Sequence, residues 1–133
     1  MLRISQEADY AIRIVGYLSK FGETGKCDAK TIATSVSVPQ RFAVKILRKL
    51  NIAGITKSYR GASGGYAVNR NPESISFLDV VECIDGIVCI NKCVNDGKNC
   101  SDNRDSCYGR KTLIELNNVI KEILKSKDFS GFN

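Results

Sequence analysis

Residues 29–68, AKTIATSVSVPQRFAVKILRKLNIAGITKSYRGASGGYAV, contain the strongest fold signal in this chain. The first eight residues of this stretch form an amphipathic helical pattern directly after Asp28, a residue type that favours helix starts. A break at residues 37–39 interrupts the pattern, and the proline there suits the first turn of a new helix. Two such helices joined by a turn of three or four residues are typical of a helix-turn-helix.

The second helix of this motif is expected over residues 40–53, with Gly54 ending it. Residues 55–59 then indicate a strand, residues 61–65 a glycine-rich turn, and residues 66–68 a returning strand. A hairpin after a helix-turn-helix makes a winged helix. The predicted buried side of the second helix consists of Phe42, Ile46, Leu47 and Leu50.

Three further helices are expected around this unit. Ser5 is a suitable cap for a helix over residues 6–21, and Ser76 with Asp79 resembles a capping box for the next helix. The last helix, residues 110–127, carries apolar residues spaced 3-4-3, which indicates a seam for a partner helix. The seam residues are Leu113, Leu116, Ile120 and Ile123.

The expected fold class is therefore mainly α with a small β-hairpin wing. A winged helix-turn-helix domain spans residues 1–85 and a cysteine-rich loop spans residues 86–108. A long C-terminal dimerisation helix over residues 109–128 and a tail over residues 129–133 complete the chain.

The distribution of charge indicates a polyanionic partner. The formal net charge is +6, and the block from Ala29 to Pro72 contains basic residues but no acidic one. The eight basic residues of that block are Lys30, Arg41, Lys45, Arg48, Lys49, Lys57, Arg60 and Arg70. A solvated basic face is the simpler alternative, but here the charge coincides with a helix-turn-helix.

Double-stranded DNA is therefore the expected partner. Long donors on the exposed side of the second helix can reach guanine acceptors in the major groove, and basic residues of the wing suit phosphates or the minor groove. The DNA-binding candidates are Gln40, Arg41, Lys45, Arg48, Lys49, Lys57, Tyr59 and Arg60. Lys30 and Arg70 are expected to touch phosphates only.

Cysteines form the second notable pattern, since four of six lie within residues 89–107 and the chain has no histidine. Cys93, Cys100 and Cys107 are each separated by six residues in polar segments. Clustered thiolates without histidine suit an iron–sulfur cluster or zinc. Zinc is disfavoured because no C-x2-C pair is present.

Three thiolates leave one ligand position open. Cys89 is the nearest candidate, although its apolar neighbours also suit a buried structural thiol. Cys83 is expected in the core, and Cys27 has no obvious partner.

Several of these segments together resemble the Rrf-type family of bacterial winged-helix regulators, in its cysteine-bearing, IscR- and NsrR-like branch. The resemblance covers about residues 1–125 and rests on EADYAIR, SYRGASGGY, LDVVECIDG and the three spaced cysteines. It implies a homodimer whose last helix packs across the dyad. It also implies an iron–sulfur cluster on Cys93, Cys100 and Cys107.

The same resemblance implies two possible sources for the fourth ligand. IscR-like members place a histidine where this chain has Arg110, so that branch does not fit. NsrR-like members use a carboxylate from the first helix of the other subunit, which corresponds to Asp9. Asp9 therefore precedes Cys89 as a candidate, and Glu7 is weaker. The cluster is expected to be 2Fe–2S or 4Fe–4S, with 4Fe–4S favoured.

The expected function is a cytoplasmic, homodimeric transcription regulator that binds a pseudo-palindromic operator and senses redox state, nitric oxide or iron–sulfur supply. The same regulator with zinc or redox-active thiols is the alternative. A thiol-dependent enzyme is disfavoured because no histidine base or C-x-x-C pair is present. A protein-interaction module would leave the basic block unexplained. No small-molecule substrate is expected, and no apolar run is long enough for a membrane span.

Overall fold

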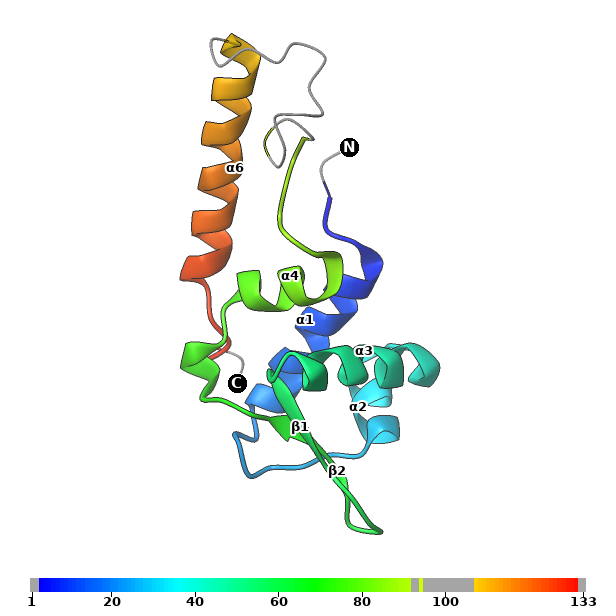
Figure 1. The fold of residues 1–133 in the computed structure, drawn as a ribbon. Coiled ribbons are helices and arrows are strands. Elements are labelled where there is room, and N and C mark those ends of the chain that lie inside the picture. Colours follow the sequence, from blue (N-terminus) through cyan, green and yellow to red (C-terminus); the bar gives the residue numbers. More distant parts are fainter. Residues whose placement is uncertain (1–2, 92–93, 95–106, 132–133) are drawn as a thin grey trace.

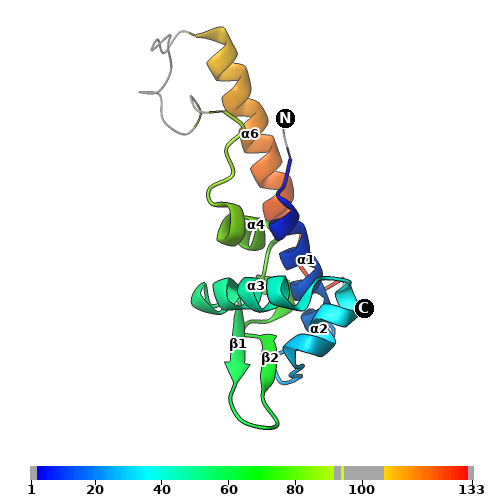
Figure 2. The same ribbon diagram turned by 90° about the vertical axis from the view of Figure 1, so that its right-hand side faces the viewer.

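A computed structural model describes residues 3–91, 94 and 107–131 of the chain. The helices and the hairpin of residues 6–85 gather at one end, while the start of the last helix, at Tyr108, lies at the opposite end (Figures 1 and 2). None of the described helices combines the length and apolarity that a bilayer span requires. The elements are α1 (Gln6–Ser19), α2 (Ala29–Val36), α3 (Gln40–Ile52), β1 (Thr56–Tyr59), β2 (Gly65–Val68), the 3-10 turn η1 (Pro72–Ser74), α4 (Phe77–Asp85) and α6 (Tyr108–Ser126).

Helix α1 is the centre of the helical cluster. Its cap is Ser5, as predicted, whose Oγ accepts a hydrogen bond from the Ala8 backbone N–H at 3.0 Å. The helix contacts α2, α3, α4 and β2. Its fully buried hydrophobic residues are Ala8, Ala11, Ile14, Val15 and Leu18.

The turn between α2 and α3 forms as the sequence predicts, with one difference at its end. Asp28 caps α2 by accepting from the Thr31 N–H at 3.1 Å. Ser37 adopts a left-handed backbone conformation (φ +57°) that reverses the chain. Pro39 stands one residue before α3 as its N-cap, not inside the first turn.

The buried side of α3 includes Ala43 in place of the predicted Phe42. Ala43, Ile46, Leu47 and Leu50 are all 0% exposed and follow the i, i+3, i+4, i+7 spacing of one helix face. The prediction that Phe42 is buried is wrong, since 38% of it is exposed. Phe42 precedes Ala43 by one residue, which is about 100° around the helix axis, and this places it at the rim of the buried face.

The wing is a two-stranded antiparallel hairpin to which the loop before α2 adds one paired residue. Thr56 pairs with Val68 and Tyr59 with Gly65. Cys27 donates to the Tyr66 carbonyl at 2.9 Å, and its own carbonyl accepts from the Tyr66 N–H at 2.7 Å. The α1–α2 loop is therefore tied to β2.

The C-terminal end of the described chain returns to the core. The predicted capping box of α4 is confirmed, with Ser76 and Asp79 each bonding the other's backbone N–H. Phe129 is 1% exposed and stacks on Phe77 with ring centroids 4.6 Å apart. Phe129 lies in the stretch predicted as a tail, yet its ring is part of the hydrophobic core.

Replacing Phe129 with alanine is expected to destabilise the protein substantially. Removing a buried phenylalanine side chain costs about 3–5 kcal/mol of unfolding free energy. Urea unfolding followed by circular dichroism measures the change. Ile52→Ala is the matched control, because Ile52 is 81% exposed; a Phe129→Ala variant as stable as this control would contradict the assignment of Phe129 to the core.

Candidate nucleic-acid interface and cysteine-bearing segment

The outward face of α3 carries four of the predicted DNA-binding residues. Gln40, Arg41, Lys45 and Arg48 are all exposed, opposite the buried face. The guanidinium of Arg41 lies 5.0 Å from the ring centroid of Phe42, a cation–π contact that positions it at the helix start. Val44, 43% exposed, adds an apolar contact surface among these donors. The face therefore combines long donors with one apolar side chain.

Lys49 lies on a different side of α3. Its Nζ is 2.8 Å from the Glu7 Oε1 of α1, and its side chain is 38% exposed. The ion pair links α3 to α1 at the edge of the core. Of the DNA-binding candidates on α3, Lys49 is thus the one whose charge already has a carboxylate partner, and Glu7 is engaged as well.

The remaining candidates lie on the wing. Arg60 is exposed next to the glycine-rich turn, and Tyr59 is 37% exposed at the end of β1. The Nζ of Lys57 is 5.8 Å from the ring centroid of Tyr59. Lys30, predicted to touch phosphates, is exposed at the start of α2, whereas Arg70 is half-buried.

The predicted metal ligands are only partly within the described chain, because Cys93 and Cys100 lie outside it. Cys107 is half-buried at the N-terminal end of α6 and makes no capping hydrogen bond. Within residues 3–91, 94 and 107–131, no three cysteine, aspartate or glutamate side chains come together as a metal site. The three-cysteine set therefore stays a prediction.

The other described cysteines have distinct surroundings. Cys89 is half-buried, and its Sγ is 2.8 Å from the Asn91 carbonyl oxygen. Burial raises the pKa of the Cys83 thiol, which packs against the core and lies 3.6 Å from the Lys49 carbonyl. Burial also raises the pKa of Cys27, partly offset by a hydrogen bond with Tyr17. Cys27 and Cys83 thus favour the neutral thiol.

Asp9 lies on the first turns of α1, with 47% of its side chain exposed. Its Oδ2 is 2.7 Å from Arg13 Nη2 and 3.5 Å from Gln6 Nε2. Both contacts use the same oxygen. Asp9 also lines a hollow together with Arg3 and Ile4.

One chain does not bring Asp9 and Cys107 together. Arg3 and Ile4, which border the hollow at Asp9, also line a groove with Ile120 of α6. Cys107 precedes Ile120 by thirteen residues, which is about 20 Å along a helix axis. Figure 1 likewise places the start of α6 far from α1.

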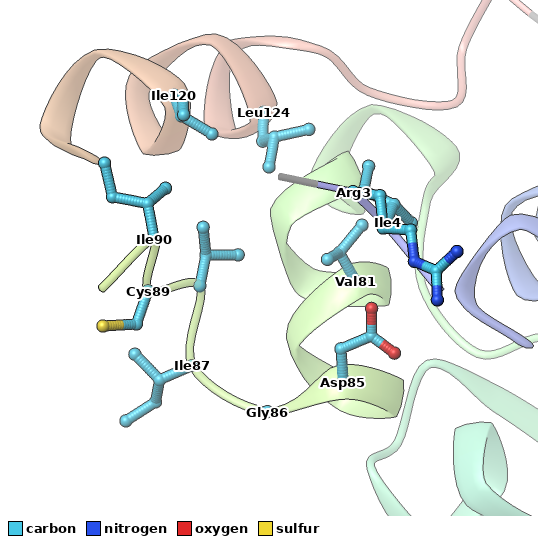
Figure 3. Close-up of a pocket in the computed structure, with 11 residues that line it drawn as sticks. Arg3, Ile4, Val81, Asp85, Gly86, Ile87, Cys89, Ile90, Ile120 and Leu124 are labelled. Carbon is cyan, nitrogen blue, oxygen red and sulfur yellow. The ribbon is translucent and has the colours of Figure 1, made fainter. Parts of the chain in front are cut away.

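The groove at this place separates the N-terminal segment from α6 (Figure 3). It has a volume of about 550 Å³, and most of its lining is aliphatic. Asp85, at the end of α4, provides a polar wall together with Arg3. The Asp85 carboxylate also accepts hydrogen bonds from the backbone N–H of Ser5, at 3.1 Å, and from the Ser5 hydroxyl.

A polar clamp fixes the segment that forms one wall of the groove and leads toward Cys93. Asn117, only 5% exposed, accepts from the Ile90 N–H at 3.0 Å through Oδ1 and donates from Nδ2 to the Val88 carbonyl at 3.3 Å. Glu82 accepts from the Val88 N–H at 2.9 Å. The side chains of α4 and α6 thereby bond the backbone of residues 88–90 from both sides.

The four residues of the predicted dimerisation seam lie on two sides of α6. Leu116 and Ile123 are 42% and 56% exposed. Leu113 and Ile120 are half-buried, and Ile120 lines the groove. Val119, 46% exposed, lies between the two exposed members. The outward apolar face of α6 is therefore Leu116, Val119 and Ile123.

Comparison with protein families matches residues 4–130 to the Rrf2 family, described as "Iron-dependent Transcriptional regulator". The chain belongs to the Rrf2 family. The predicted family is thus confirmed, and so is the prediction that the chain is a transcriptional regulator and not an enzyme.

Individual Rrf2 relatives agree with this assignment. The HTH-type transcriptional regulator Rv1287 of Mycobacterium tuberculosis is 34% identical over 85 residues, which is 64% of this chain and 53% of that protein. The chain therefore spans about half the length of this relative. The regulator CymR of Bacillus subtilis is 26% identical over 125 residues, 94% of this chain and 85% of CymR.

Solved structures confirm the predicted winged-helix fold. The structure of CymR, described as the global cysteine regulator of B. subtilis, superposes with a TM-score of 0.83 at 25% identity and covers 100% of this chain and 99% of CymR. The structure of T. potens IscR gives a TM-score of 0.77 at 22% identity and covers 97% of this chain and 84% of IscR. The IscR likeness shows the shared fold.

Asn117 is a residue of this Rrf2 chain that sequence reasoning did not single out. It stands in the row Leu113, Asn117, Ile120 and Leu124, whose 4-3-4 spacing marks the inward side of α6. A polar residue in an otherwise apolar row is the signal for a buried hydrogen-bonding role.

Asn117→Leu is expected to loosen the segment of residues 88–90. Leucine has a similar size but leaves the Ile90 N–H and the Val88 carbonyl without their partner, which costs about 1–3 kcal/mol per unsatisfied group. Urea unfolding gives the stability, and hydrogen exchange gives the protection of the Ile90 amide. The exposed neighbour supplies the control, Asn118→Ala; equal protection of the Ile90 amide in both variants would rule out the clamp.

Proposed function

We propose that this Rrf2 regulator is a homodimer that binds a pseudo-palindromic DNA operator and senses redox state, nitric oxide or iron–sulfur supply through an iron–sulfur cluster. The DNA-binding part rests on one observation above all. The exposed face of α3 in a helix-turn-helix lies within a block of 44 residues, 29–72, that contains no acidic residue.

In this proposal α3 enters the major groove. Arg41 and Lys45 address the O6 and N7 acceptors of guanine, and Gln40 suits adenine. Arg60 and Lys57 bring the wing to the adjoining backbone or minor groove. Lys49 contributes through the position of α3, because its ammonium is paired with Glu7. Two such helices in a dimer would lie roughly 34 Å apart.

Dimerisation is proposed to use the outward apolar face of α6, Leu116, Val119 and Ile123. Their 3-4 spacing repeats the pattern of a two-helix seam. Three large apolar side chains exposed along one helix face favour coverage by another apolar surface. Leu113 and Ile120 are half-buried on the inward side of α6, where they pack the helix against its own chain.

The described residues fit an iron–sulfur ligand set in three respects. Cys107 is half-buried at a helix N-terminus, where negative charge is favoured, and its Sγ is not used as a cap. Burial raises the pKa of the Cys27 and Cys83 thiols, which disfavours these two residues as thiolate ligands. Thiolate donors with no histidine suit iron and sulfide.

The proposed ligands are Cys93, Cys100 and Cys107 of one chain with Asp9 of the other. The cluster, when bound, supplies a redox-active centre that oxidants or nitric oxide can attack. In this set Asp9 has to come from the second chain, because within one chain Asp9 lies far from Cys107. Asp9 Oδ1 remains available while Oδ2 holds Arg13. The set links α1 of one subunit to α6 of the other.

A regulator without a cluster is the second candidate. CymR, which matches almost the full length of this chain, is described as a global cysteine regulator. In that case the thiols of residues 89–107 would bind zinc or react directly with oxidants. Metal and sulfide content distinguishes the two candidates.

Arg41→Ala and Lys45→Ala are each expected to weaken binding to a cognate duplex by about fivefold to one hundredfold, as the loss of one base contact worth about 1–3 kcal/mol predicts. The cognate duplex is one that the wild-type protein selects from a randomised pool, and fluorescence anisotropy at fixed salt gives the affinities. Binding to random DNA should fall much less. Lys20→Ala is the matched control, because Lys20 is an exposed lysine outside the proposed DNA-binding set. It should preserve the preference for the selected duplex; if Arg41→Ala and Lys45→Ala also preserve it, the reading face is wrongly assigned.

Anaerobically purified protein is expected to be brown, with iron and acid-labile sulfide in about equal amounts and little zinc. Cys107→Ser should abolish the visible absorption, whereas Cys27→Ser should retain it. Asp9→Ala should change the spectrum or shorten the life of the cluster in air without removing the cysteine ligands. Glu23→Ala, which removes another exposed carboxylate, serves as its control. Colourless protein after reconstitution with iron and sulfide, or about one zinc per chain, would exclude the cluster.

A further inference from the structure

We propose that Lys26 contacts a DNA phosphate, so that the loop between α1 and α2 is a third DNA-contacting element beside α3 and the wing. The inference rests on the proposed DNA binding and adds an element to it. Lys26 lies outside both the helix-turn-helix and the hairpin, and outside the acid-free block. Its place is set by the contact between this loop and β2.

The backbone of the loop extends the sheet of the wing by one residue. Cys27 and Tyr66 exchange two hydrogen bonds of 2.9 and 2.7 Å, as adjacent antiparallel strands do. Successive side chains of an extended segment point to opposite faces. Cys27 packs on the hydrophobic core, so Lys26 projects from the outer face of the wing, where it is exposed.

Gly65 makes this approach possible. A Cβ atom at Gly65 would lie 2.6 Å from the Cys27 carbonyl oxygen, which is too close for any side chain. Gly65 is also the residue that pairs with Tyr59 across the hairpin. The missing side chain leaves the Tyr59 ring next to the loop.

The Tyr59 ring gathers two lysines. The Nζ of Lys26 is 5.1 Å from the ring centroid, and that of Lys57 is 5.8 Å from it. Attraction to the ring holds each ammonium near the wing without neutralising its charge. Two ammonium groups therefore lie at one partly exposed aromatic ring, and the exposed Arg60 follows Tyr59 in the chain.

The acidic residues nearest to Lys26 along the chain, Glu23 and Asp28, form no ion pair among the described residues. The Asp28 carboxylate is directed to the start of α2, where it accepts from the Thr31 N–H at 3.1 Å and from the Thr31 hydroxyl at 2.6 Å. The ion pairs found among the described residues join Arg13 to Asp9, Lys49 to Glu7 and Lys121 to Glu82, and none involves the cations at Tyr59. Like charges held together without a carboxylate favour a polyanion, and the wing that carries them belongs to the DNA-binding motif.

Lys26→Ala is the test, with fluorescence anisotropy on a random duplex and on a duplex selected by the wild-type protein, over a range of salt concentrations. Loss of one phosphate contact should reduce the slope of log K against log salt by about 0.9. Affinity at moderate salt should fall about two- to fivefold, the effect of one exposed charge contact. The fall should be equal on both duplexes, because a phosphate contact carries no sequence information.

Lys20→Ala is the matched control, since Lys20 is an exposed lysine at the other end of the same loop. Lys20→Ala removes the same charge, and its slope of log K against log salt should equal that of the wild-type protein. A Tyr59→Ala background should diminish the effect of Lys26→Ala, whereas Tyr59→Phe, which keeps the ring, should preserve it.

The outcomes separate this inference from the proposed function. A Lys26→Ala variant with the slope and affinity of Lys20→Ala would overturn the inference while wild-type DNA binding stood. A larger loss on the selected duplex than on the random one would also overturn it, because Lys26 would then read bases. Wild-type protein that binds neither duplex at low salt would overturn the proposed function and this inference together.

Discussion

The packing of α1 against α2, α3, α4 and β2 is the constraint on which the rest of the molecule depends. Ala8, Ala11 and Gly16 are buried along this helix, and their small size lets the neighbouring elements approach closely. Helix α3 and the returning strand β2 both rest on α1. Their relative position is therefore set by one shared support, so the two elements proposed to contact DNA can act as a single surface.

Around α1, some charged side chains are paired and others face solvent. Glu7 of α1 pairs with Lys49 of α3, while Arg41, Lys45 and Arg48 on the outer face have solvent around them. In the same first turn of α1, Asp9 pairs with Arg13 through one of its two oxygens. A single helix turn thus holds α3 through Glu7 and carries the proposed cluster ligand at Asp9. A change in the tilt of α1 would therefore move both α3 and Asp9.

Local sequence signals were enough to predict the fold. Asp28 and the capping box at Ser76 act within a few residues, so their patterns are readable without tertiary structure. The sequence did not show which of the neighbouring residues Phe42 and Ala43 faces the core, because that depends on tertiary packing. In the structure Ala43 is buried and Phe42 is exposed. Contacts between distant residues were also missed, including Lys49 with Glu7 and Asn117 with residues 88–90. For the site, the exposed basic face was predictable, whereas the separation of Asp9 from Cys107 needed the position of α6.

The burial of Phe129 has a consequence for the order in which the protein is made. The winged unit is encoded before residue 86, yet its core is closed by an aromatic ring that follows α6. During translation the N-terminal helices can collapse early, but the Phe77 ring lacks its stacking partner until residue 129 has emerged. The core of the winged unit is therefore completed only after α6, the element proposed to recruit the second subunit, has been made.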